Sequence, residues 1–147
     1  MDHCVFLSTV ELDPVSAAIR LRTECSWSHV GFMRLADSWT FSAMEDGHGV
    51  AWRAPDVHAK ILKLSAPNVD AALAEALSQQ GKPYDAVDIT GIALGFNWAV
   101  ANHFICSTLV VWAFQQAGAP LLNPTFIPLD HVTPRDILLS PSVTQLL

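Results

Sequence analysis

Short runs rich in β-branched, aromatic and other apolar side chains recur through the first 65 residues. Runs of this kind, separated by turn residues, predict β-strands. We place strands at residues 4–10, 29–35, 39–44, 50–53 and 58–65. Three residues join the second and third runs, a loop length typical of a β-hairpin. Most of the N-terminal half is therefore predicted to form a sheet.

One helix interrupts the predicted strands. Asp13 is a typical N-cap residue, and the proline that follows suits the first helical position, so the pattern predicts a helix over residues 14–22. The apolar residues that recur at helical spacing, and so form its expected buried face, are Val15, Ala18 and Ile19.

Helical patterns prevail after residue 66. A helix is predicted over residues 69–80 and ends at Gly81, and a short helix or irregular stretch is expected before residue 101. Residues 106–117 are apolar almost all round, which is typical of a central, buried helix that ends at Gly118. A cap-and-proline pair opens a last short helix at Pro134. This division predicts a single α+β domain over residues 1–147.

Composition narrows the function classes. With 147 residues, 51% of them hydrophobic and 15% charged, the chain has enough apolar side chains for one well-filled core. A net charge of −6 gives no electrostatic reason to bind nucleic acid. No apolar stretch approaches the roughly 20 residues that cross a membrane. We therefore expect neither a nucleic-acid partner nor a membrane span.

The cysteine count and the first residues bear on location. Three cysteines at irregular spacing do not resemble a disulfide framework. The N-terminus carries Asp2 and His3 without a basic region, unlike a conventional signal peptide. A cytoplasmic protein is the default expectation, with delivery by another system as the alternative.

Cys106 is the first candidate for chemistry, because it stands at the predicted start of the buried helix. The amide groups and the dipole at a helix start favour an anion, which lowers a thiol pKa and produces a nucleophile. The alternative is a buried cysteine that only packs, since free cysteine is among the most buried residue types.

His29 is the natural partner for such a thiol. It begins a predicted strand two residues before Gly31, and glycine inside a strand often marks the close approach of another group. The competing histidines are His3, His48, His58, His103 and His131. None of them shows the spacing of a zinc site and no Cys-x2-Cys pair exists, so we predict neither a metal site nor a cofactor.

Five segments in a fixed order carry a resemblance to a known family. They are Ser28-His29-Val30-Gly31-Phe32, Trp39-Thr40-Phe41-Ser42-Ala43, Gly81-Lys82-Pro83-Tyr84-Asp85, Phe104-Ile105-Cys106-Ser107 and Val132-Thr133-Pro134. Together they resemble the permuted NlpC/P60 papain-like superfamily, above all its YiiX/YebB-like cysteine hydrolases and, more distantly, lecithin:retinol acyltransferase-like enzymes. The order, with the histidine strand before the cysteine helix, is that of the permuted members.

The resemblance implies a fold and roles for four residues. The fold is a circularly permuted papain-like domain, in which the nucleophile helix packs against an antiparallel sheet. Cys106 would be the nucleophile, His29 the general base and Tyr84 a substrate-binding residue near the cleft. The third polar group falls on Ser42, where relatives often carry glutamate or histidine. A serine accepts a hydrogen bond but cannot stabilise imidazolium as a carboxylate does. Glu45 is the alternative if a bulge turns it toward the histidine.

The expected function is that of a cysteine hydrolase that forms an acyl-enzyme. Its substrate would be a small molecule, a peptide or an acyl lipid, cleaved at an amide, ester or thioester bond. The alternatives are a lipid acyltransferase and a non-catalytic binding module on the same scaffold.

Overall fold

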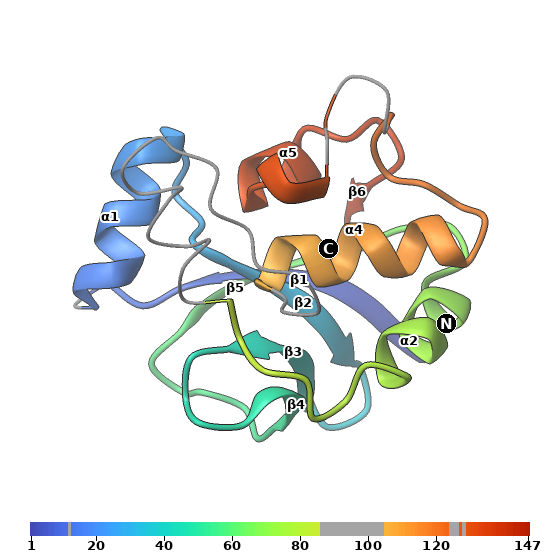
Figure 1. Ribbon diagram of the computed structural model, residues 1–147, viewed down its shortest axis with the longest axis horizontal. Coiled ribbons are helices and arrows are strands. Elements are labelled where there is room, and N and C mark those ends of the chain that lie inside the picture. The colour runs from blue at the N-terminus through green and yellow to red at the C-terminus, as the bar shows by residue number, and fades with distance from the viewer. Residues whose placement is uncertain (12, 86–104, 124–126, 128) are drawn as a thin grey trace.

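The computed structural model describes residues 1–11, 13–85, 105–123, 127 and 129–147. Its centre is a six-stranded sheet in the order β4-β3-β2-β1-β5-β6, with every neighbouring pair antiparallel (Figure 1). The strands are β1 (His3–Thr9), β2 (His29–Arg34), β3 (Thr40–Met44), β4 (Gly49–Arg53), β5 (Lys60–Ser65) and β6 (Thr144–Gln145).

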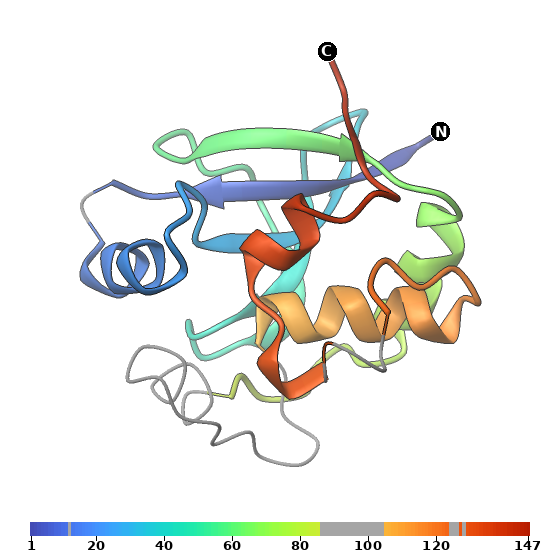
Figure 2. The ribbon, with the colours of Figure 1, turned by 90° about the horizontal axis from the view of Figure 1, so that it is seen from above.

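The helices lie mainly on one side of this sheet, as Figure 2 shows. They are α1 (Pro14–Thr23), α2 (Val69–Leu77), α4 (Cys106–Gln116) and α5 (Pro134–Leu138), with a 3₁₀ turn, η1, at Leu129–His131. Helix α4 packs against β2, β3 and α2, whereas α1 stands apart, at the end of the sheet where β1 finishes. The α+β class predicted from the sequence is confirmed.

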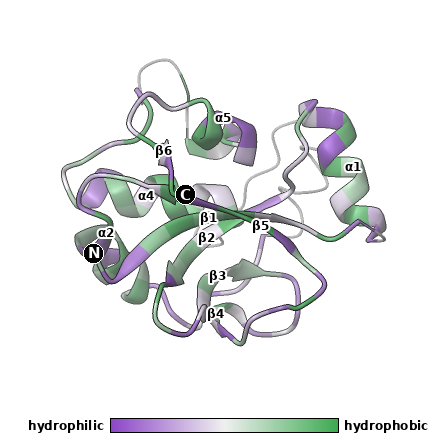
Figure 3. Ribbon diagram, turned by 180° about the vertical axis from the view of Figure 1, so that it is seen from behind, coloured by the Kyte–Doolittle hydropathy of each residue, from purple (hydrophilic) through white to green (hydrophobic). Residues whose placement is uncertain are grey.

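Helix α4 is as buried as its apolar sequence predicts. Leu109, Val110 and Phe114 have no exposed surface, or almost none, and Phe114 stacks on Phe32 of β2 with ring centroids 5.9 Å apart. Alternate residues of β1, β2 and β3 face the same core. Figure 3 shows the hydrophobic colouring along these elements. Close packing here fixes where the first residue of α4 lies.

Most predicted element boundaries agree with the structure to within three residues. Helix α2 ends at Leu77 rather than residue 80, because the next amides bond to the carbonyl three residues back rather than four. Gly118 has a positive φ angle directly after the cap of α4, as expected of a residue that ends a helix, whereas Gly81, also at positive φ, lies four residues beyond the end of α2. The short strand β6 was not predicted, since two polar residues give no strand pattern.

The predicted apolar face of α1 is confirmed at Ile19 and wrong at its other two members. Val15 and Ala18 are exposed, and the buried residues are Ser16, Ile19 and Thr23. The Ser16 hydroxyl lies between those of Thr9 and Ser28, so polar contacts hold the helix to the sheet. Figure 3 shows hydrophilic and hydrophobic residues alternating along α1.

Two of the sequence predictions fall on residues that the structure does not describe. They are the short helix or irregular stretch before residue 101 and the candidate His103. Among the described helices, none is both long and apolar enough to cross a membrane. The assignment of residues 1–147 to one domain stays a prediction.

Candidate functional site

A cavity of about 480 Å³ opens at the end of the sheet where β1 finishes and β2 begins. Three of the four predicted site residues, Cys106, His29 and Tyr84, line it. Its remaining walls come from α1, β1, β5 and the β3–β4 hairpin. The apolar side chains of these walls include Val15, Ile19, Phe6, Ile61, Met44 and Ala43. Carboxylates are contributed by Asp13, Glu45 and Asp56. Segments distant in sequence therefore meet around the thiol and the imidazole.

Cys106 is the first residue of α4, and its side chain is almost fully buried at 3% exposure. The backbone amides of Val30, Ser107 and Cys106 itself donate to the sulfur, as a helix start predicts. Burial nevertheless raises the pKa of the thiol to about 11, because these amides do not compensate for the loss of water around the thiolate. The prediction of a lowered thiol pKa is therefore wrong for this structure.

Two buried hydroxyls fix the start of α4. Ser107 donates from Oγ to the Val132 carbonyl at 2.6 Å, which ties the helix to the segment before α5. Thr108 accepts the Ile105 amide hydrogen at Oγ1, 3.1 Å away. This is the reciprocal bond that glutamate or glutamine usually makes at the third helical position. The cysteine is thus held on a rigid platform.

His29 is the first residue of β2 and is only partly exposed. Its Nε2 lies 3.0 Å from the Ser42 hydroxyl, and the Phe6 ring packs on it at a centroid distance of 5.8 Å. Burial, with a smaller contribution from the positive charge of Arg53, lowers the pKa of His29 to about 4. The imidazole is therefore neutral at neutral pH, and it makes no direct hydrogen bond to the Cys106 thiol within the described contacts.

Ser42, rather than Glu45, occupies the position beside the imidazole. Ser42 is fully buried in the middle of β3, whereas Glu45 is exposed in the following turn, where it lines the cavity. Gly31 makes the contact between β2 and β3 close. A Cβ atom at Gly31 would lie 2.7 Å from both the Phe41 carbonyl oxygen and the Ser42 Cβ. The close approach expected from this glycine is confirmed, and it brings Ser42 to His29.

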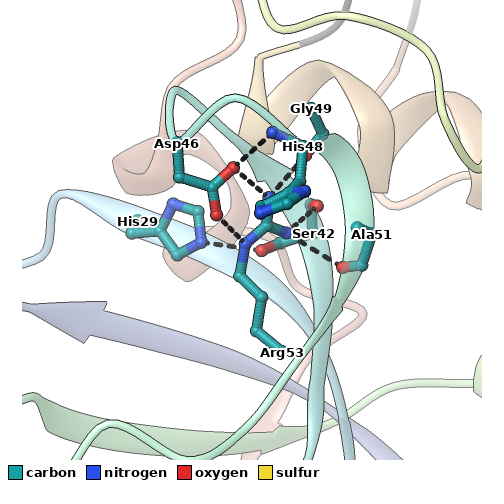
Figure 4. Close-up of polar contacts among 7 residues, drawn as sticks. All are labelled: His29, Ser42, Asp46, His48, Gly49, Ala51 and Arg53. Carbon is teal, nitrogen blue, oxygen red and sulfur yellow. Dashed lines mark hydrogen bonds and ion pairs between the residues drawn. The ribbon is translucent and has the colours of Figure 1, made fainter.

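An arginine that the sequence did not single out fixes the backbone around Ser42 (Figure 4). Arg53 donates to the carbonyl oxygen of Ser42 at 2.7 Å and makes a bidentate ion pair with Asp46 at 2.6 and 2.8 Å. Its side chain is 15% exposed. Arg53 ends a strand and Asp46 lies in a turn, and neither fits a short motif. Arg53 could not be singled out from the sequence, because its contacts with Ser42 and Asp46 exist only once the β3–β4 hairpin has formed.

Tyr84 reaches the cavity because its turn docks along β4. The Val50 amide donates to the Lys82 carbonyl at 2.9 Å, and the Gly81 amide donates to the Val50 carbonyl at 2.8 Å. Gly49 permits this contact, because its φ is +61° and a Cβ there would lie 2.1 Å from the Lys82 oxygen. Tyr84 is partly buried against the core.

The other described histidines and cysteines are outside the cavity lining. His48, His58 and His131 are exposed, Cys25 is partly buried, and Cys4 is buried beside Phe6 and Met33. Within the described ranges, no three His, Cys, Asp or Glu side chains come close enough to hold a metal ion.

Comparison with known proteins agrees with this arrangement at the level of fold. No family model matches the chain, and no curated sequence is significantly similar to it. A crystal structure described as that of the metalloprotein YiiX from Escherichia coli O157:H7 superposes with a TM-score of 0.71. The two sequences are 19% identical, over 100% of this chain and 96% of the other. The chain has a YiiX-like fold. This likeness is consistent with the predicted papain-like architecture, and at this identity it concerns the fold alone.

Proposed function

We propose that this chain is a cysteine hydrolase in which Cys106 forms an acyl-enzyme and His29 acts as general base. One observation carries the proposal: the thiol and the imidazole line one cavity, at the start of a buried helix and of the adjacent strand. Nε2 of the imidazole is hydrogen-bonded to the Ser42 hydroxyl, so Nδ1 is the nitrogen that accepts a proton in this proposal.

The resting pair is neutral in this proposal. The pKa of Cys106 is about 11 and that of His29 about 4, so at neutral pH neither side chain is charged. The thiol proton therefore passes to Nδ1 as the sulfur attacks the substrate carbonyl, rather than beforehand. Backbone amides in the first turn of α4 are placed to stabilise the oxyanion. The tetrahedral intermediate then expels the amine, alcohol or thiol of the substrate, which takes the proton from His29 and leaves a thioester on Cys106. His29 next removes a proton from the water that attacks this thioester, and it gives that proton to the departing sulfur, which releases the acid and restores the thiol.

The substrate is a carbonyl compound with an apolar part. Apolar atoms make up most of the cavity surface, although about half of the lining residues are polar, and Tyr84 contributes a ring with a polar tip. These features suit a small molecule, a peptide or an acyl lipid, bound at an amide, ester or thioester.

YiiX is described as a metalloprotein, whereas the described residues of this chain include no group of three or more His, Cys, Asp or Glu side chains that could hold a metal ion. Cys106 and His29 line one cavity, and the third polar group is the Ser42 hydroxyl, a weak metal ligand. Since no three-residue cluster occurs in the described parts of the chain, we assign no step to a metal.

The proposal is tested by trapping the acyl-enzyme with activated aryl esters and peptide amides. Intact-mass spectrometry should show one acyl group on Cys106, released with time, and no labelling in Cys106→Ala. His29→Ala should slow acylation by about 100-fold or more. Cys25→Ser is the matched control, since it removes a partly buried thiol outside the cavity lining and should leave labelling unchanged. Full turnover in Cys106→Ala would refute the assignment.

A non-catalytic binding module is the second candidate, and the neutral pair favours it. With Ser42 in place of a carboxylate, nothing beside the ring compensates an imidazolium fully. A binding module predicts saturable binding of the ester without acyl transfer. Alkylation of Cys106 that accelerates only as the pH nears 11, and is indifferent to His29→Ala, would support this alternative over the hydrolase.

A further inference from the structure

Arg53 has every donor of its guanidinium occupied. Nε and one Nη2 hydrogen bind the Asp46 carboxylate at 2.6 and 2.8 Å, and the second Nη2 hydrogen binds the Gly49 carbonyl at 2.7 Å. The two Nη1 hydrogens bind the carbonyls of Ser42 at 2.7 Å and Ala51 at 2.9 Å. These five bonds equal the number of N–H donors that a guanidinium has.

This saturation decides what Arg53 can do. It lines the cavity beside His29, where an arginine would ordinarily suggest binding of a substrate carboxylate or phosphate. With no donor left over, it serves instead to join β3, the following turn and β4. Asp46 strengthens the turn by also accepting the His48 amide hydrogen at 3.0 Å.

Ser42 is the residue on which these contacts converge. Its hydroxyl contacts His29, and its carbonyl is held by Arg53. Gly31 lets β2 approach β3 closely, because a Cβ there would lie 2.7 Å from Ser42 Cβ. Figure 4 shows the contacts of Ser42 with His29 and Arg53.

We propose that Arg53 and Asp46 act as a positioning pair, which holds Ser42 against Nε2 of His29 and so fixes the orientation of the imidazole. In this proposal both residues act through Ser42 rather than by donating hydrogen bonds to the substrate. The inference rests on the proposed function for its effect on turnover, while its structural claim concerns only the state of the His29 ring.

The same pair also sets the charge around His29. The positive charge of Arg53 lowers the pKa of the imidazole, and the negative charge of Asp46 raises it. The other titratable groups that line the cavity are Cys106 from α4, Glu45 after β3, Asp56 after β4, Asp13 before α1 and Tyr84. Removing the charge of Arg53 or of Asp46 should therefore shift the pKa of His29, and a loss of stability alone would not produce such a shift.

Three variants test the proposal, with the His29 ring observed by NMR of ¹⁵N-labelled histidine in the folded protein. Arg53→Lys keeps the charge but supplies at most three donors, too few to replace the guanidinium fork. We expect it to weaken the Nε2 contact to Ser42 and to lower kcat by about 10- to 100-fold with a smaller change in KM. Arg53→Gln should raise the pKa of His29, and Asp46→Asn should lower it further.

The preceding hairpin supplies a matched control. Arg34 makes a bidentate ion pair with Asp37 at 2.9 and 2.7 Å, but neither residue lines the cavity. Arg34→Lys should leave the His29 spectrum and kcat unchanged.

The His29 spectra test the positioning role of Arg53 and Asp46, and the kinetics test the proposed hydrolase. His29 signals that respond as expected in a chain without turnover would support the positioning pair and refute the hydrolase. Arg53→Lys and Arg53→Gln proteins that are less stable but have unaltered His29 tautomer and titration would overturn the positioning role.

Discussion

At the scale of the residue, Cys106 illustrates a competition between local dipoles and burial. Three backbone amides point at the sulfur, as its place at a helix start predicts, yet the thiol pKa is raised to about 11. A dipole effect is local and follows from position in the helix, whereas desolvation depends on everything packed around the side chain. The helix start alone therefore predicts where the sulfur lies better than it predicts its charge.

The contact between Ser42 and His29 leads to a prediction for a single substitution. Ser42→Ala removes the partner of His29 Nε2, so the ring loses its fixed orientation. We expect kcat for ester cleavage to fall by about 10- to 100-fold, since a misplaced base transfers protons poorly. Loss of one buried hydrogen bond should lower the free energy of unfolding by about 1 kcal/mol.

Ser140→Ala is the control for this prediction. Ser140 is also buried and donates to the Leu121 carbonyl at 2.6 Å, outside the cavity lining. We expect Ser140→Ala to lower the free energy of unfolding, measured by urea denaturation, by an amount similar to that of Ser42→Ala, and to leave kcat unchanged. Equal kinetic losses in the two variants would contradict a specific role for Ser42.

At the scale of the element, the contact between β2 and β3 shapes the site. Their regular pairing joins Phe32 with Phe41 and Met33 with Thr40, near the hairpin loop. Beyond these pairs, the Val30 amide donates to the Cys106 sulfur, and Gly31 meets the β3 backbone closely. The start of α4 thus reaches the β2 backbone one residue from His29.

Gly31→Ala tests this contact. The new Cβ would lie 2.7 Å from Ser42 Cβ and 2.8 Å from the Phe6 ring, so β3 must shift. Overpacking of this kind should cost about 1–3 kcal/mol of unfolding free energy and, by moving Ser42, reduce kcat. Gly118→Ala is the comparison: its φ of +69° makes it destabilising too, but open space surrounds it after α4. A Gly31→Ala protein with normal stability and activity would show that the two strands are not tightly coupled.

The sequence predicted most of the elements and three of the cavity residues. Strand and helix patterns are local, and the order of the motifs along the chain was enough to single out Cys106, His29 and Tyr84. The choice between Ser42 and Glu45 needed the fold, because it depends on which β3 residue lies opposite Gly31. Arg53 was not predicted, since its five hydrogen bonds go to three carbonyls and a turn carboxylate that come together only in the folded hairpin.

At the scale of the whole molecule, the partly exposed His29 ties stability to pH. Its pKa is about 4 in the folded chain, compared with 6.5 for an ordinary histidine. As the pH falls through 6.5, the unfolded chain takes up a proton that the folded chain refuses until about pH 4. Protonation therefore favours unfolding, and the stability associated with His29 is present above 6.5 and lost toward 4.

We expect the free energy of unfolding to fall by about 2–3 kcal/mol from this group between about pH 7 and about pH 4. The contribution is measured as the difference between wild type and His29→Gln in urea denaturation at each pH. His58→Gln, at an exposed site, is the control and should follow the wild type. An identical pH dependence in His29→Gln and the wild type would contradict a lowered His29 pKa.

By itself the sequence determined the α+β class and the approximate places of the elements, and it singled out Cys106 and His29, which line one cavity. These follow from periodicity, capping residues and motif order, which act over a few neighbouring positions. Only the tertiary structure decided that both side chains are neutral, that Ser42 meets the imidazole and that Arg53 holds Ser42. Those properties depend on desolvation and on contacts between segments distant in the chain, which local sequence patterns do not encode.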